Sequence, residues 1–112
     1  MLPKINRIRK KRDFEAIFKR GQGGTRSFRG SFLSFKAVKN NLELARFGFV
    51  VSKKVSKKAT VRNKIKRRLC VAVEGQIGNI KTGTDNLFIA LPGIEKKEFF
   101  EIKETVKKCL EQ

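Results

Sequence analysis

The stretch Lys53–Arg68, KKVSKKATVRNKIKRR, holds nine lysines and arginines in sixteen residues and no acidic residue. No aspartate or glutamate occurs between Leu44 and Val73. Like charges at this density repel one another, so the block favours a polyanionic partner that neutralises it. A solvated basic surface is the plainer interpretation, but apolar residues are interleaved with the cations and argue against a simple charged tail.

The apolar residues of this region repeat with helical spacing. Four of them follow the i, i+4, i+8, i+11 pattern and form one stripe: Val61, Ile65, Leu69 and Ala72. At ~100° per residue such a stripe lies on one side of a helix. The spacing predicts a helix from about Lys58 to Gln76 that packs on a core through the stripe and presents cations over the remaining arc. Nucleic acid is the polyanion that we expect it to bind.

Composition limits the other function classes. The chain has 112 residues and a formal net charge of +18, which indicates one domain with a modest core and a strongly basic surface. Residues 1–73 hold 22 basic and 3 acidic residues, whereas residues 74–112 hold 6 and 7. No apolar run approaches the ~20 residues of a membrane span, and the basic start lacks the apolar segment of a signal peptide. We therefore expect a cytoplasmic protein without a membrane partner.

The residue types available for catalysis are few. The chain has no histidine, which removes the commonest general base and metal ligand. The two cysteines, Cys70 and Cys109, lie far apart and form no metal motif, so we expect free thiols. Tryptophan and tyrosine are absent but ten phenylalanines are present, so stacked bases would lie on phenylalanine or arginine planes.

The remaining elements follow from pattern. Residues 1–12 form a basic arm, and Asp13 caps a short helix that presents Phe14 and Phe18 on one face and ends at Gly21. Core packing is the plainer role for both rings. Residues 31–38 alternate as a strand, with Phe35 on its apolar side, and residues 46–53 form a second strand. We expect these two strands to pair as an antiparallel hairpin, with a brief strand at residues 25–28.

The last third of the chain contains one strand and one helix. The nearly continuous apolar run of residues 86–91 predicts a central strand that is buried on both faces. A closing helix is expected from about residue 96 to residue 110, with Cys109 on its buried stripe. The order of helix, strands, basic helix, strand and helix indicates an α+β fold in a single domain that spans residues 1–112.

A metal-dependent nuclease site is poorly supported by these residues. Cleavage of a phosphodiester by protein-bound Mg²⁺ needs clustered carboxylates. Seven of the ten acidic residues lie after Val73, and those of the closing helix are spaced like a solvated face. The glycines that follow Arg20 lack the GK[ST] ending of a P-loop. The chain is suited to holding RNA rather than cutting it unaided.

The segment SKKATVRNKIKRR resembles the signature of the bacterial ribonuclease P protein subunit, in which an Arg-Asn-Arg helix follows a Ser-Lys-Lys strand end. The matching positions are Ser52, Lys53, Lys54, Ala59, Arg62, Asn63, Ile65, Lys66 and Arg67. The basic arm, the Asp13-Phe14 pair, Phe18 and Gly21 also match, as does an apolar strand that ends in Pro92-Gly93. The resemblance covers almost the whole chain, and three separate motifs in the right order make it specific.

The resemblance implies a function. The family is the protein partner of a catalytic RNA, and the holoenzyme hydrolyses one phosphodiester bond to remove the 5′ leader of precursor tRNA. Mg²⁺ would be the cofactor, held mainly by the RNA, and no residue of the protein would be catalytic. The resemblance also implies a mixed sheet with the basic helix in a left-handed crossover, similar to the second domain of ribosomal protein S5. Composition and spacing alone favour the right-handed connection.

The resemblance also implies two surfaces. The catalytic RNA would face Lys58, Arg62, Asn63, Lys64, Lys66, Arg67 and Arg68. The single-stranded leader of precursor tRNA would lie in a cleft lined by Phe14, Phe18 and Phe35, with Ser52, Lys53 and Lys54 at its edge. Three positions depart from the family pattern: Lys64 replaces an arginine, Cys70 a basic residue and Leu91 an arginine. Lysine keeps the charge at position 64 but loses the planar, bidentate guanidinium.

Two other functions stay open at this point. Composition alone favours a small ribosomal protein or a general RNA chaperone, which would not stimulate leader removal by a catalytic RNA. A protein-only nuclease would cleave precursor tRNA by itself, and the missing acidic cluster argues against it. None of these functions involves a small-molecule substrate.

Overall fold

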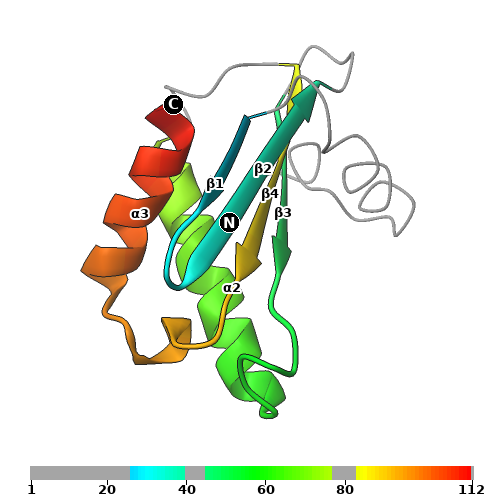
Figure 1. Cartoon of the computed structure of the whole chain (residues 1–112). Helices are drawn as coiled ribbons and strands as arrows, with labels where there is room; N and C mark the ends of the chain where they lie inside the picture. The colour runs from blue at the N-terminus through cyan, green and yellow to red at the C-terminus, as the bar shows by residue number, and fades with distance from the viewer. Residues whose placement is uncertain (1–25, 40–44, 77–82, 112) are drawn as a thin grey trace.

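The computed structural model describes residues 26–39, 45–76 and 83–111 of the chain. Its elements lie in the order β1 (Arg26–Arg29), β2 (Leu33–Lys39), β3 (Arg46–Val50), α2 (Ala59–Glu74), β4 (Thr84–Ala90), η3 (Ile94–Lys96) and α3 (Phe99–Glu111). The strands form one mixed sheet, and α2 and α3 lie against the same face of it (Figure 1). This is the α+β architecture that the element order predicts.

The strand order differs from the predicted one in one respect. The sheet runs β1-β2-β4-β3, so β4 lies between β2 and β3, antiparallel to the first and parallel to the second. The predicted hairpin between β2 and β3 is therefore wrong. The apolar run of β4 provides the reason, because side chains on both of its faces are buried, and this pattern is typical of a central strand.

The hairpin that does form joins β1 to β2. Phe28 lies opposite Phe35, and the Gly30 N–H donates to the Leu33 carbonyl at 2.8 Å across the turn. A Cβ at Gly30 would lie 3.1 Å from the Phe28 ring and 3.4 Å from the Leu33 carbonyl oxygen. The turn is therefore tight enough to favour glycine. The brief strand expected at residues 25–28 is present as β1, one residue further along.

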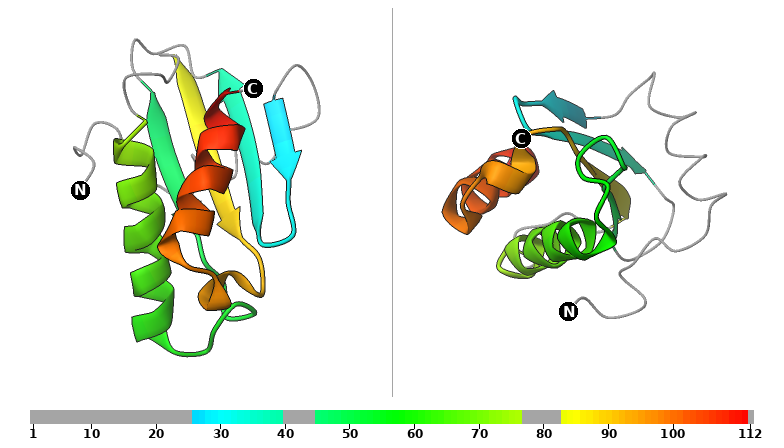
Figure 2. Two further views of the ribbon diagram at one scale, coloured as in Figure 1. Left: turned by 90° about the vertical axis from the view of Figure 1, so that its left-hand side faces the viewer. Right: turned by 90° about the horizontal axis from the view of Figure 1, so that it is seen from below.

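Helix α2 connects the parallel strands β3 and β4 through a left-handed crossover. In the left view of Figure 2 the helices lie in front of the sheet, β4 points downwards and lies to the right of β3. Turning that view so that both strands point upwards puts β4 on the left of β3, which is the left-handed sense. Most crossovers between parallel strands are right-handed, so the handedness implied by the family resemblance is confirmed here against the general tendency.

The main core fills the space between the sheet and the two helices. Its largest fully buried side chains are Phe35, Phe47, Phe88, Leu33, Leu69, Ile94 and Ile102. The rings of Phe35 and Phe88 pack with centroids 4.9 Å apart, and Phe49 stacks on the other side of Phe88 at 5.8 Å. The central position of β4 therefore lets one phenylalanine join both neighbouring strands to the core.

The opposite face of the sheet carries a second, smaller apolar cluster. Val38 and Leu87 are buried there, and Val50 and Ile89 pack against them. These residues alternate with the core-facing residues along each strand, as the period of two requires. Beside them, the Arg46 guanidinium forms a bidentate pair with the Asp85 carboxylate, with N–O distances of 2.8 and 2.7 Å.

Helix α3 begins later than its amphipathic pattern predicts. The chain leaves β4 through Gly93, whose φ of 106° favours glycine, and forms the separate turn η3 before the helix. The Glu98 N–H then donates to the Glu101 side chain at 3.1 Å, which satisfies a backbone donor at the helix start. The expected start near residue 96 therefore shifts to Phe99.

Candidate nucleic-acid interface

The apolar seam of α2 is where the sequence places it. Ile65, Leu69, Ala72 and Val73 are buried, and Val61 is half-buried against the main core. Burying such side chains contributes about 1.5–3 kcal/mol each for the larger ones. The seam therefore fixes the rotation of the helix, and this rotation decides which of its cations face outward.

The outward arc of α2 is almost entirely cationic. Five of the side chains assigned to this arc are exposed: Lys58, Asn63, Lys64, Lys66 and Arg67. Arg62 and Arg68 are half-exposed. In the part of the chain that the structure describes, none of these cations pairs with a carboxylate, whereas Arg46 of β3 pairs with Asp85 of β4. The positive charge of this surface is therefore not neutralised by the described residues.

Arg62 has a structural contact as well as a place on this surface. Its Nη1 donates to the carbonyls of Ser56 and Lys57, both at 2.9 Å, and so ties the loop before α2 to the first turn of the helix. Guanidinium carries five donors in a planar fork. Arg62 therefore holds the loop through one nitrogen, and Nε and Nη2 take no part in that contact.

The loop between β3 and α2 presents the Ser-Lys-Lys segment. Ser52, Lys53 and Lys54 are exposed, with one residue between them and the end of β3. Val55 is buried behind them, and its N–H donates to the Ser52 carbonyl at 3.1 Å. The buried valine and this turn position the two lysines outward, next to the start of α2.

The structure does not bring together all of the residues assigned to the leader cleft. Phe14, Phe18 and the basic arm of residues 1–12 lie outside the described residues, so their assignment stays a prediction. Phe35 is only 1% exposed, and its ring packs against Phe88 in the main core. A ring enclosed in this way has no free face on which a base can stack, so the assignment of Phe35 to the cleft is wrong. The sequence already indicates the core side, because Leu33 and Ala37, two positions away on either side, lie on the same face of the strand.

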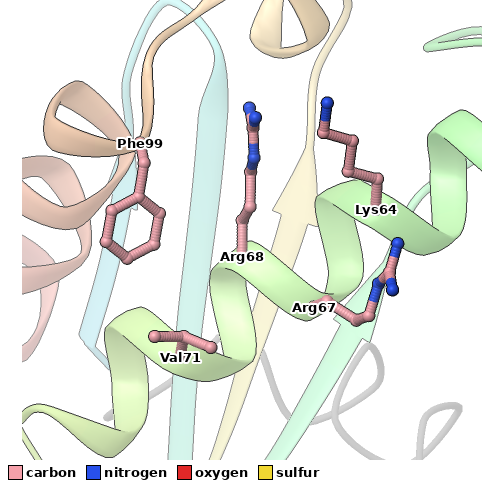
Figure 3. A pocket seen from close by; sticks show the side chains of 5 residues that line it. All are labelled: Lys64, Arg67, Arg68, Val71 and Phe99. Carbon is pink, nitrogen blue, oxygen red and sulfur yellow. The ribbon is translucent and has the colours of Figure 1, made fainter.

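An open groove lies between α2 and α3. It has a volume of about 380 Å³ and is lined by Lys64, Arg67, Arg68, Val71 and Phe99 (Figure 3). The Phe99 ring lies at the start of α3 and is only half-buried, packed against the edge of the main core. Val71 is 53% exposed. The sequence contained one signal for this groove, because Val71 is an apolar residue on an arc of α2 that otherwise carries polar residues.

The described carboxylates are occupied or dispersed. Asp85 binds Arg46, and Glu95 and Glu101 accept hydrogen bonds from the backbone N–H groups of Gly93 and Glu98. Within residues 26–39, 45–76 and 83–111, no cluster of three or more histidine, cysteine or acidic residues is placed to hold a metal ion. Also in this part of the chain, neither α2 nor α3 has the length and apolarity required to cross a bilayer.

Comparison with known proteins decides the family. The model of the family described as Ribonuclease P matches residues 2–112. The chain belongs to the ribonuclease P protein family. It is 33% identical to the ribonuclease P protein component of a Pseudanabaena species, over 98% of this chain and 92% of that protein. The protein component from Alkaliphilus metalliredigens is 36% identical, over 90% of this chain and 86% of that one.

Solved structures of the family share the fold. The ribonuclease P protein of Thermotoga maritima superposes with a TM-score of 0.80 at 30% identity and covers 93% of this chain and 94% of its own. That of Staphylococcus aureus gives a TM-score of 0.82 at 26% identity, over 95% and 93% of the two chains. As a family member, the chain is a subunit of ribonuclease P, a ribonucleoprotein endoribonuclease that processes tRNA, and it has the RNA of that enzyme as its partner.

Proposed function

We propose that the cationic arc of α2 lies along the catalytic RNA of ribonuclease P and that the chain also positions the 5′ leader of precursor tRNA for removal. The observation that carries this proposal is the set of exposed or half-exposed cations on α2, which have no carboxylate partner among the described residues. A rigid helix with a buried seam presents these charges at fixed spacing. Phosphates of a folded RNA would neutralise them and release counterions.

The α2 surface consists of Lys58, Arg62, Asn63, Lys64, Lys66, Arg67 and Arg68. We assign it to the catalytic RNA. We assign Phe14, Phe18, Ser52, Lys53 and Lys54 to the leader of precursor tRNA. The exposure of the last three residues next to the start of α2 supports this division, because a strand bound there would lie beside the catalytic RNA.

The chemistry of the reaction would come from the RNA. Mg²⁺ is the metal ion that we assign to the holoenzyme, held mainly by RNA phosphates, where it would stabilise the charge that develops as the phosphodiester is hydrolysed. The described carboxylates of the chain support this division of labour, since Asp85, Glu95 and Glu101 are engaged in contacts of the fold. The protein would contribute binding and the screening of repulsion between phosphates. We propose the cytoplasm as the site of this reaction.

One reaction series tests the function. Precursor tRNA is incubated at low Mg²⁺ with the catalytic RNA alone, with the chain alone, and with both. We expect leader removal by the combination to exceed that by the RNA alone, because the chain replaces part of the screening that Mg²⁺ otherwise provides. No stimulation would favour a general RNA-binding protein, and cleavage by the chain alone would mean a protein nuclease.

The leader assignment is tested by substrate comparison. Replacing both Phe14 and Phe18 by alanine should weaken the binding of precursor tRNA more than that of mature tRNA, by about 1–3 kcal/mol per lost stack. The measurement is the Kd of the holoenzyme for each substrate. Equal losses for the two substrates would mean that both rings belong to the core.

A further inference from the structure

The α2–α3 groove combines an apolar, aromatic surface with a set of cations. The proposed phosphate contacts require only the cations. Its lining combines Val71 and the half-buried Phe99 ring with the cations Lys64, Arg67 and Arg68. Figure 3 shows the Phe99 ring extending from α3 towards α2, where Val71 and Arg68 lie. Phosphate binding explains the cations, but it leaves an accessible aromatic ring and an exposed valine without a partner.

The three cations of the lining are available for a ligand. In the described part of the chain, Lys64, Arg67 and Arg68 form no ion pair and donate no side-chain hydrogen bond. A purely apolar occupant, such as a peptide segment, would cover Val71 and Phe99 but would leave these charges beside a desolvated surface, which is costly. The occupant that matches both parts is planar on one side and anionic on the other.

An open groove of this size accommodates a small unit. A volume of about 380 Å³ lies at the lower end of the roughly 300–1,000 Å³ of ligand sites. A base inside an A-form duplex has both faces covered by its neighbours, so its ring is not free to contact phenylalanine. An unpaired nucleotide presents a free base and its phosphates at the same time, and it meets both requirements.

We propose that the α2–α3 groove holds one unpaired nucleotide of the catalytic RNA, with its base against Phe99 and Val71 and its phosphates against Lys64 and Arg68. The inference rests on the proposed function, since it takes the α2 surface as the one that meets the catalytic RNA. It adds a specific contact to a surface otherwise bound through charge. The groove opens on the helix side of the sheet, away from the cluster of Val38 and Leu87.

The absence of tryptophan and tyrosine from the sequence provides a direct probe. Phe99→Trp introduces a single tryptophan into the groove, and Phe100→Trp, one residue along and 67% exposed, is the matched control. Titration with catalytic RNA should quench Phe99→Trp fluorescence strongly, because a stacked base quenches indole, and should affect Phe100→Trp much less. Equal quenching of both variants, or none at Phe99→Trp, would overturn the proposal.

Affinity provides a second measurement. Phe99→Leu keeps an apolar side chain against the core but removes the aromatic face, and it should raise the Kd for catalytic RNA at least about 5-fold, the lower end for one lost stack. The salt dependence of Kd should stay unchanged. Arg68→Gln should instead lower the slope of log Kd against log salt by about 0.7–0.9. Wild-type affinity of Phe99→Leu, measured on folded protein, would contradict the proposal.

Two further measurements distinguish this nucleotide from other molecules that could fill the groove. Quenching of Phe99→Trp by precursor tRNA alone, at a salt concentration where catalytic RNA gives none, would assign the groove to the substrate and overturn the choice of RNA. A fluorescence change with protein concentration in the absence of RNA would indicate a second copy of the chain and would overturn it as well. Failure of the proposed function itself would be seen in a different experiment, in which wild-type protein would not stimulate leader removal by the catalytic RNA.

Discussion

At the scale of single residues, Arg46 and Asp85 form a bidentate ion pair in the described part of the chain. Its two N–O distances are 2.8 and 2.7 Å, and the side-chain exposures are 22% and 7%. The pair links β3 to β4 at opposed positions of the parallel ladder. It therefore helps to fix the register between β3 and β4, the two strands that the basic helix connects.

Breaking this pair should destabilise the fold. Asp85→Asn removes the carboxylate and leaves Arg46 without its buried counter-charge. We expect a loss of about 3 kcal/mol in the free energy of unfolding, the lower end for a buried pair because Arg46 keeps some solvent contact. Urea denaturation measures it. Glu104→Gln on the exposed face of α3 is the control, with a change within about 0.5 kcal/mol; equal effects would mean that the pair contributes nothing.

Cys109 makes the stability sensitive to alkaline pH. Burial raises the pKa of the Cys109 thiol from 9.0 to about 12. The folded state therefore keeps a proton that the unfolded chain loses above pH 9, so stability is fully present below pH 9 and declines as the pH rises towards 12. In Cys109→Ala, the difference in urea midpoint from wild type should shrink between pH 8 and pH 11. A constant difference would contradict the assigned burial effect.

At the scale of elements, α2 was the most predictable part of the molecule. Its apolar stripe and its cations determine which side packs and which side faces outward, and the observed bounds fall within three residues of the predicted ones. Strand pairing was less predictable. Period-two alternation identifies β2 and β3 but does not say whether two neighbours in sequence are neighbours in the sheet; only the burial of both faces of β4 indicates that it separates them.

The same division applies to the candidate site. Exposure of the Ser-Lys-Lys loop and of the α2 cations follows from their sequence pattern. Phe35 was misassigned because the family resemblance outweighed the alternation pattern of the strand. That pattern puts Phe35 on the same face as Leu33 and Ala37, which is the core side. The groove beside Phe99 could not be predicted, because it depends on how α2 and α3 are placed relative to each other. The pattern of a single sequence does not determine that placement.

The α2 surface gives a prediction at this scale. Arg67→Gln removes one exposed charge from α2 and should weaken binding of catalytic RNA and lower the salt slope of log Kd by about 0.7–0.9. Lys103→Gln makes the same change of charge at an exposed position of α3 and should leave the slope nearly unchanged. Filter binding over a range of salt concentrations measures both. Equal slopes for the two variants would mean that net charge alone, and not the α2 surface, binds the RNA.

At the scale of the whole molecule, the charge distribution determines the response to salt. The formal net charge is +18, and the first 73 residues carry all of that excess. If 6–10 phosphates are neutralised, the affinity for catalytic RNA should fall by about 10³–10⁵ between 50 and 200 mM salt. A shallow dependence would remove the electrostatic basis of the proposed function.

The central position of β4 also bears on how the protein is made. Strands β2 and β3 do not touch each other, and the strand that joins them is synthesised after both and after α2. A nascent chain that ends at Glu74 therefore has two separate strand edges and a basic helix without its sheet. Because β4 contributes Phe88 to the core, cooperative folding has to wait until residues 84–90 leave the ribosome. Until then, the most cationic segment of the chain is exposed beside ribosomal RNA.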